Sequence, residues 1–227
     1  MNNASLRLEN IGKSFTHKGI ITPVLRAVTI TFKQGSSYAI MGVSGTGKST
    51  LMHIMAGIEE PSSGHIFLND QCMSGLSHNS QIQHMMHSFG LVFQKPYLIA
   101  ELTVLENVAL PGLIAGHSYA SATQAADELV RAVELESKQH HKIATLSGGQ
   151  QQRACLARAL YHKPAFLIAD EPTGSLDEVT ADSMVKLIRS FCTQFGMGVI
   201  ISTHDVRVAH QMAVRYKLHN GIVEQID

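Results

Sequence analysis

The sequence predicts an α/β fold built around a mostly parallel sheet. Short runs rich in Val, Ile and Leu alternate along the chain with segments of helical spacing. Strands of that composition are typical of a parallel sheet that is buried on both faces. In addition, a glycine-rich turn over 42–47 joins one such strand to a helical segment. These two observations favour an α/β architecture over an all-helical or all-β one.

Seven segments have the pattern of strands. The first two alternate apolar and polar residues, as strands with one buried face do, and most of the others are mainly apolar. We expect strands over 5–11, 28–32, 36–41, 64–69, 89–93, 166–169 and 199–201. The last stretch, 214–226, should form a hairpin that turns at Asn220-Gly221, because Asn-Gly suits a two-residue hairpin turn.

The helical segments have apolar residues three or four positions apart. One helix should begin at Lys48 and run through Leu51, Ile54 and Met55. The remaining helical spacing lies over 80–88, about 103–135, from Gly149 through Leu160, and around 178–192. We find no internal repeat, low-complexity tract or long linker, so the chain is expected to be a single domain over 1–227.

Composition excludes several classes of protein. The 18 Lys and Arg balance the 18 Asp and Glu, which argues against a broad nucleic-acid-binding face. No apolar run approaches the roughly 18–20 residues that span a bilayer, and the start does not resemble a secretory signal. The three cysteines are far apart and form no CxxC pair, which suits a reducing compartment. We therefore expect a cytosolic globular protein.

The glycine-rich turn carries a phosphate-binding motif. Residues 42–49 (GVSGTGKS) fit GxxxxGK[ST] and lie between a predicted strand and a predicted helix. Backbone N–H groups of such a turn surround phosphate oxygens, and the helix N-terminus adds its dipole. The alternative is a glycine-rich turn without a ligand. The nucleotide-binding residues expected here are Gly42, Ser44, Gly45, Thr46, Gly47, Lys48, Ser49 and Thr50. Lys48 should reach the β- and γ-phosphates of the nucleotide, and the Ser49 hydroxyl should bind Mg²⁺.

Two further strands end in polar residues of the kind that phosphate chemistry needs. Asp170 and Glu171 follow the apolar strand 166–169, and His204 follows the strand 199–201. Asp170 should hold Mg²⁺, and Glu171 is placed to orient or deprotonate an attacking water. His204 could bond a γ-phosphate oxygen or that water, since parallel strands end at one sheet edge. The alternative for Asp170 and Glu171 is an ordinary pair of acidic residues at the end of a strand. The other twelve histidines of the chain do not have the spacing of metal ligands.

A second candidate anion site precedes the helix that starts near Gly149. The turn comprises Ser147, Gly148, Gly149 and Gln150, within the sequence LSGGQ. It offers backbone N–H groups and a hydroxyl at a helix N-terminus. Taken alone, it could equally be an ordinary helix cap at Ser147.

Together these motifs resemble those of the ATP-binding cassette (ABC) ATPases over essentially the whole chain. The matching residues are the phosphate loop 42–49, the Q-loop Gln94, the signature 146–150, Asp170-Glu171, the D-loop 174–177 and the switch His204. The resemblance implies a RecA-like P-loop NTPase core with an antiparallel β part over approximately 1–93 and 151–227. It also implies a helical signature subdomain over approximately 94–150.

The resemblance further implies how the site residues act. Two copies would pair head-to-tail, so that Ser147 and Gly149 of one copy close over ATP held by the other, with Asp177 of the D-loop nearby. Phe15 would stack on adenine, although a core aromatic is the alternative. Gln94 would sense Mg²⁺ and the attacking water. The stretches 96–98 and 102–112 would form a groove for a transmembrane partner, or else be subdomain core.

Within the family, three stretches resemble the lipoprotein-releasing (LolD-type) and macrolide-exporter (MacB-type) ATPases: 39–64, 103–111 and 169–177. That similarity implies a peripheral ATPase subunit at the cytoplasmic face of the inner membrane. It would drive a separate permease that has a large extracytoplasmic domain. The alternatives are an FtsE-type regulator that signals to a cell-wall hydrolase, and the ATPase of an importer. A nucleic-acid ABC ATPase would need coiled-coil insertions or fused cassettes, which this sequence lacks.

Overall fold

The computed structural model describes residues 4–73, 76 and 78–227, which form two sheets flanked by helices. The larger sheet has the strand order β10-β9-β3-β8-β7-β6 and the smaller one the order β2-β1-β4-β5. The larger sheet comprises β3 (Ser37–Met41), β6 (Phe89–Phe93), β7 (Phe166–Asp170), β8 (Gly198–Thr203), β9 (Val214–His219) and β10 (Ile222–Ile226). The smaller comprises β1 (Ser5–His17), β2 (Ile20–Lys33), β4 (Ser63–Leu68) and β5 (Gln71–Cys72).

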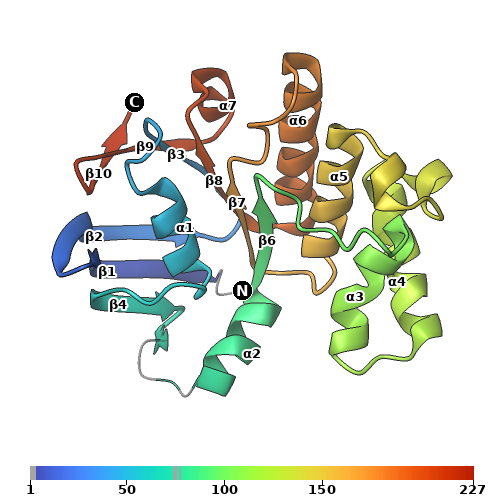
Figure 1. Cartoon of the computed structure of the whole chain (residues 1–227), viewed down its shortest axis with the longest axis horizontal. Coiled ribbons are helices and arrows are strands. Elements are labelled where there is room, and N and C mark those ends of the chain that lie inside the picture. The colour runs from blue at the N-terminus through green and yellow to red at the C-terminus, as the bar shows by residue number, and fades with distance from the viewer. Residues whose placement is uncertain (1–3, 74–75, 77) are drawn as a thin grey trace.

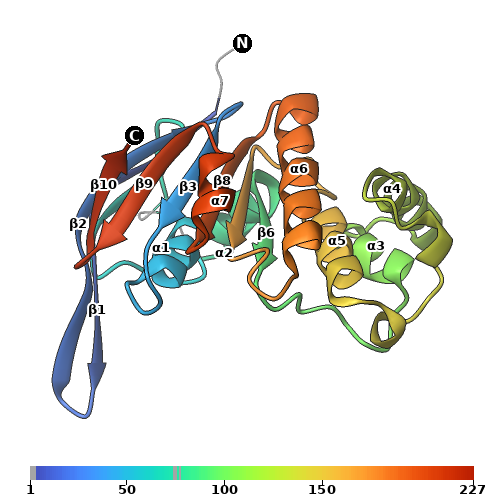
Figure 2. The ribbon, with the colours of Figure 1, turned by 90° about the horizontal axis from the view of Figure 1, so that it is seen from above.

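The helices lie on both sides of the large sheet (Figure 1). They are α1 (Lys48–Met55), α2 (His78–Ser88), α3 (Val104–Ile114), α4 (Tyr119–Ala132), α5 (Gly148–Ala159), α6 (Glu178–Phe195) and α7 (Val206–His210). Of these, α3–α6 lie at the end opposite the small sheet, and α1 lies beside the small sheet. Short 3₁₀ turns cover Glu136–Lys138 and Ile143–Thr145. Seen from above, α3 and α4 occupy one end of the molecule, and the β1–β2 hairpin projects at the other (Figure 2).

The prediction of a mostly parallel sheet is confirmed. Strand β3 pairs parallel with β8 and β9, and β7 pairs parallel with β6 and β8. Only β10 runs antiparallel, because it returns from β9 through the predicted turn at Asn220-Gly221. Both turn residues have positive φ, 49° and 79°, as a type I′ hairpin turn requires. The carboxyl ends of β3, β7 and β8 therefore meet at one edge of the sheet.

The larger sheet is buried on both faces. Alternate residues, among them Ala39, Leu167 and Ile201, face a core formed with helices α3–α7. Their neighbours, such as Ile40 and Ile168, face a second core formed with α1 and the small sheet. This period of two explains why these strands are almost wholly apolar in sequence. The antiparallel sheet and α1 thus cover one face, and the larger group of helices covers the other.

The structure corrects several predicted boundaries. Strand β2 begins at Ile20 rather than near residue 28, because its first half pairs with β1 in an exposed hairpin that has no buried face. The helical spacing over 103–135 belongs to two helices, α3 and α4. Gly116 separates them with φ +87°, and Ser118 caps α4. The short elements β5 and α7 were not predicted. No helix within the described ranges is both long and apolar enough to cross a bilayer.

Candidate functional site: a phosphate pocket at the sheet edge

The phosphate loop leads from β3 directly into α1. Gly47 occupies the N-cap of α1 with φ 100°, and no side chain caps the helix. The N–H groups of the first helical turn are therefore free of intrahelical partners and favour an anion. They border a pocket of about 500 Å³. Its walls are formed by Val24, Ser44, Gly45, Gly47, Lys48, Ser49, Thr50, Gln94, Glu171 and His204.

Lys48 is the central cation of this pocket. It is only 5% exposed, and its Nζ donates to the carbonyl oxygens of Gly42 at 2.9 Å and Val43 at 3.2 Å. The same Nζ lies 3.1 Å from Oε1 of Glu171. A buried ammonium needs such acceptors, because leaving it unpaired in a low-dielectric site is costly. An incoming phosphate would compete with the Glu171 carboxylate for Lys48.

Glu171 lies between Lys48 and His204. Its Oε2 is 3.1 Å from Nδ1 of His204, and its backbone N–H donates to the carbonyl and hydroxyl of Ser202. Glu171 has φ 45°, a left-handed conformation that is uncommon for a residue with a side chain. Strain of this kind persists where the surrounding structure enforces it, often at functional sites. The chain turns sharply here and directs the carboxylate into the pocket.

The oxygen donors expected for Mg²⁺ lie at the same edge. Asp170 ends β7, is 9% exposed, and accepts a short hydrogen bond from the hydroxyl of Ser202. Ser49 is exposed on the pocket wall. Among the described residues no group of three or more His, Cys, Asp or Glu could enclose a metal. One carboxylate and one hydroxyl fit Mg²⁺, which keeps several waters and binds nucleotide phosphates.

Gln94 follows β6 and reaches the same pocket. Phe93 pairs with Asp170 in the sheet, so Gln94 emerges beside the end of β7. A β-carbon built on Gly174 would lie 3.0 Å from Nε2 of Gln94 and 3.3 Å from Oε2 of Glu171. The three residues are therefore in close proximity, and the small size of residue 174 leaves room for both side chains.

Sequence reasoning missed three residues that hold the chain on either side of Gln94. Gln152 donates to the Phe93 carbonyl at 2.8 Å, and Arg158 donates to the carbonyl oxygens of Pro96 and Tyr97. Asn107 is fully buried and bonds both the N–H and the carbonyl of Ile99. Only Asn107, a polar residue within the apolar stretch 104–114, gave a signal in the sequence, because a buried polar side chain needs partners.

Phe15 lies on the exposed β1–β2 hairpin, opposite Thr22. Its ring is 42% exposed, and the Lys13 amine lies 4.9 Å from the ring centroid. The exposure excludes the alternative that Phe15 is a core residue. A second pocket of about 510 Å³ begins at Thr22 and shares Val24, Ser44 and Gly45 with the phosphate pocket. The hairpin that carries Phe15 therefore adjoins the phosphate loop.

The signature residues do not line the phosphate pocket of their own chain. Ser147 caps α5 through a capping box: its Oγ accepts from the Gln150 N–H, and Gln150 Oε1 accepts from the Ser147 N–H. The helix-cap alternative is thus structurally correct, although it does not exclude anion binding. Asp177 similarly caps α6, and its hydrogen bonds from Thr180 lower the pKa of its carboxyl group.

The sequence profile described as ABC transporter matches residues 25–174, which include the phosphate loop, Gln94, the signature and Glu171. The chain belongs to the ABC transporter family. It is 39% identical over 225 residues to the lipoprotein-releasing system ATP-binding protein LolD of Idiomarina loihiensis, covering 99% of both chains. This confirms the resemblance to LolD-type ATPases that the sequence motifs predict.

Solved structures support the same assignment. The chain matches a dimeric structure of the bacterial ABC transporter cassette MJ0796 with a TM-score of 0.89 and 35% identity, covering 96% of each chain. A dimeric post-hydrolysis state of MJ0796 bound to ADP and Pi gives the same TM-score at 33% identity, covering 98% of this chain and 99% of that one. The fold is that of an ABC cassette, and the chain is an ABC ATPase that binds ATP.

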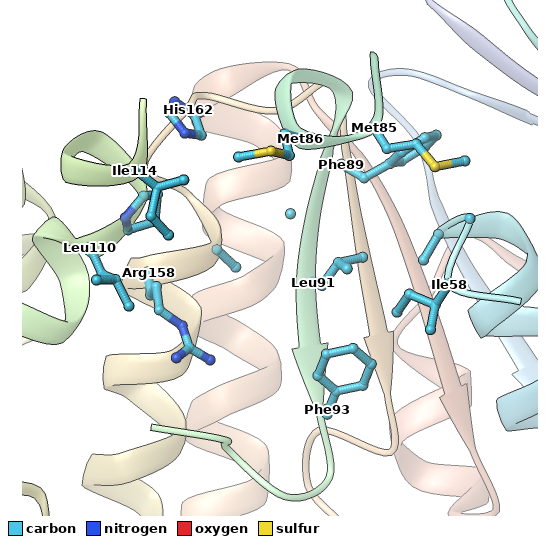
Figure 3. A pocket seen from close by; sticks show the side chains of 15 residues that line it. Ile58, Met85, Met86, Phe89, Leu91, Phe93, Leu110, Ile114, Arg158 and His162 are labelled. Carbon is cyan, nitrogen blue, oxygen red and sulfur yellow. The ribbon is translucent and has the colours of Figure 1, made fainter. Parts of the chain in front are cut away.

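A second surface is an apolar groove of about 470 Å³ between α2, β6, α3 and α5. Figure 3 shows Leu110 and Ile114 on one side of it and Met85, Met86 and Phe89 on the other. Of the stretches expected to form a groove, Leu110 and Pro111 do line it, whereas Pro96, Tyr97 and Leu98 do not. The contribution of α2 was not predicted, because the sequence does not show which elements α3 will lie beside.

Proposed function

We propose that two copies of this chain pair head-to-tail around two MgATP and that closure of the dimer drives a separate membrane permease. One observation carries the proposal. The phosphate pocket gathers Lys48, Glu171 and His204 on one chain, while the signature turn of that chain borders no part of the pocket. A signature supplied by a second copy would complete the site. The MJ0796 cassettes, whose structures are dimeric, support the pairing of two copies.

Within one copy, the uncapped N-terminus of α1 and Lys48 would hold the phosphates of ATP. When Lys48 turns to phosphate, it releases Oε1 of Glu171, which lies 3.1 Å away in this structure. Glu171 is then free to orient and deprotonate a water, with His204 beside it to hold the water or a γ-phosphate oxygen. Bound Mg²⁺, held by Ser49 and Asp170 with Gln94 nearby, would offset phosphate charge. Phe15 would stack on adenine.

The partner copy would supply the remaining groups. Ser147, Gly148, Gly149 and Gln150 form the exposed N-terminus of α5, whose dipole and N–H groups favour the γ-phosphate. Asp177 lies at the start of the neighbouring helix α6 and would approach the same nucleotide. Such preorganised donors stabilise charge in the transition state, so hydrolysis would require the closed dimer.

The permease would be of the kind that the LolD or MacB ATPases serve, with a large extracytoplasmic domain, and the work would be lipoprotein release, export or mechanotransmission. The ATPase would then sit peripherally at the cytoplasmic face of the inner membrane. The name of the Idiomarina relative supports lipoprotein release. Association of the purified chain with a co-expressed permease that has such a domain tests this. A cell-wall hydrolase as the downstream partner would instead favour the FtsE-type function, and a solute-binding protein an importer.

The apolar groove should be where the permease docks. Ile114 lines it and is 66% exposed, so an Ile114→Asp variant should fold normally and keep its ATPase activity. We expect that variant to lose permease association, because a carboxylate in an apolar interface is left desolvated and unpaired. Co-purification with the permease measures this. Tyr119→Asp, at an equally exposed position on α4, is the matched control. Equal retention of permease by both variants would exclude the groove.

His162 at the end of the groove predicts a pH dependence of stability. Burial lowers the pKa of its imidazole, and His87 and His117 nearby lower it further. The folded state therefore favours the neutral ring. The neutral ring makes its full contribution to folding stability above the pKa of the unfolded state, about 6.5, and this contribution is lost as the pH falls below that value. Between about pH 7.5 and 5.5, the melting temperature of the wild type should fall more than that of His162→Gln. The exposed His140→Gln should behave as the wild type; equal slopes for all three proteins would contradict the assignment.

A further inference from the structure

Two elements that the proposed dimer presents to its partner are packed directly together. The signature turn opens α5, and the D-loop opens α6. A β-carbon on Gly149 would lie 2.5 Å from Cγ2 of Thr180, and one on Gly148 would lie 3.9 Å from Cδ2 of Leu176. The absence of a side chain at residue 149 therefore allows the first turns of the two helices to touch. A shift of either helix along the other would move one of the two elements relative to the partner's nucleotide.

One helical turn beyond this contact, a single side chain joins the same two helices. Arg153 lies four residues after Gly149 on α5, and its Nη2 donates to Oγ of Ser183 at 2.8 Å. Ser183 lies three residues after Thr180 on α6. Each residue is thus about one turn from the contact at the helix starts. Two points of contact, one steric and one polar, fix the register between α5 and α6.

The same guanidinium also holds the end of α4. Its Nη1 donates to the Val133 carbonyl at 3.0 Å and to the Glu134 carboxylate at 2.5 Å. The Arg153 side chain is 18% exposed, whereas Glu134 is 72% exposed. The exposed ion pair contributes little on its own. The hydrogen bonds to Val133 and Ser183 are the better sheltered ones, and Arg suits the task because its planar donors are fixed in direction.

We propose that Arg153 is a positioning residue for ATP hydrolysis: through Ser183 it holds the signature turn and the D-loop in one register, so that both reach the partner's nucleotide together. This inference rests on the head-to-tail dimer proposed above. It assigns Arg153 no contact with ATP. Its removal should therefore impair dimer closure and turnover while nucleotide binding to the phosphate pocket of a single copy stays intact.

Ser183→Ala is the sharpest test, because it removes the bond to α6 and leaves those to Val133 and Glu134 in place. We expect kcat to fall about tenfold, the cost of a hydrogen bond to a charged group, with the ATP affinity of the monomer unchanged. Ser183→Thr keeps the hydroxyl and should restore kcat. Ser190→Ala is the matched control: Ser190 lines the same surface pocket beside α6 as Ser183, but its hydroxyl donates to the Leu187 carbonyl of its own helix.

The readouts are kcat, the dissociation constant for MgATP, ATP-dependent association and the melting temperature. Loss of kcat and association in Ser183→Ala, with unchanged nucleotide affinity and rescue by Thr, supports the positioning role. A wild-type kcat in Ser183→Ala overturns the positioning role. An equal loss of kcat in Ser183→Ala and in the control Ser190→Ala also overturns it. If the unsubstituted protein hydrolyses ATP but never associates into dimers, the proposed head-to-tail dimer is wrong, and this inference is wrong with it. If the unsubstituted protein does associate, and Ser183→Ala has the same kcat and the same association, only the positioning role of Arg153 is contradicted.

Discussion

Glu171→Gln should abolish turnover while leaving ATP bound. The amide keeps the size of the side chain but cannot accept a proton from water, and loss of a general base lowers a rate by about 10²–10⁴-fold. The amide also removes the negative charge that lies 3.1 Å from Lys48 in this structure. Lys48 is then free for phosphate, so ATP affinity should be equal to or higher than that of the wild type.

Release of inorganic phosphate measures turnover, and equilibrium binding of a fluorescent ATP analogue measures affinity. Glu178→Gln provides the matched control, because Glu178 is an exposed carboxylate at the start of α6 that pairs only with Arg207 among the described residues. That control should hydrolyse ATP as the wild type does. Retention of full hydrolysis by Glu171→Gln would remove Glu171 from the role of base.

Lys48→Ala should weaken MgATP binding. The substitution deletes a buried cation and its charge-assisted bonds to phosphate, each worth about 1.5–3 kcal/mol, so affinity should fall about 10- to 100-fold. It also leaves the Glu171 carboxylate without its cationic neighbour, directed into a pocket that must accept anions. The net charge of the pocket therefore becomes more negative, which disfavours phosphate binding.

Isothermal titration calorimetry with MgATP measures this loss, and Lys95→Ala serves as control because Lys95 is exposed directly after Gln94. The control should bind as the wild type does. Unchanged affinity in Lys48→Ala would contradict the account of the phosphate loop, since no other lysine or arginine lines that pocket among the described residues.

The sequence was sufficient to predict that several candidate residues meet at one sheet edge, because their placement follows from local rules. The phosphate loop, Asp170-Glu171 and His204 each follow a strand, and parallel strands end at one edge, so the pocket could be expected without coordinates. The pairing of Phe93 with Asp170 then places Gln94 there as well. For the phosphate loop, Asp170-Glu171 and His204, the direction of the strands was enough, whereas Gln94 was expected only from the resemblance to the ABC family.

Features that depend on contacts between distant segments could not be predicted. The ion pair of Lys48 with Glu171 and the positive φ of Glu171 arise from how β7 and the phosphate loop meet. The groove lining depends on α2, whose position beside β6 no local pattern encodes. The first half of β2 lacks a buried face, so its sequence has no alternation of apolar and polar residues from which a strand could be predicted. The break at Gly116 was overlooked because the apolar spacing continues across it.

The most direct test of the shared nucleotide site is the mass of the Glu171→Gln protein in saturating MgATP, measured by light scattering with and without Ser147→Asp. Aspartate caps a helix as well as serine does, so α5 should stay intact, while its charge would face the partner's γ-phosphate. Ser118→Asp, the equivalent change at the cap of α4, is the control. We predict dimers for Glu171→Gln alone and with Ser118→Asp, and monomers with ATP still bound when Ser147→Asp is added. A Glu171→Gln protein that remains monomeric with ATP bound, or that dimerises equally well with Ser147→Asp, would contradict a site shared between two copies.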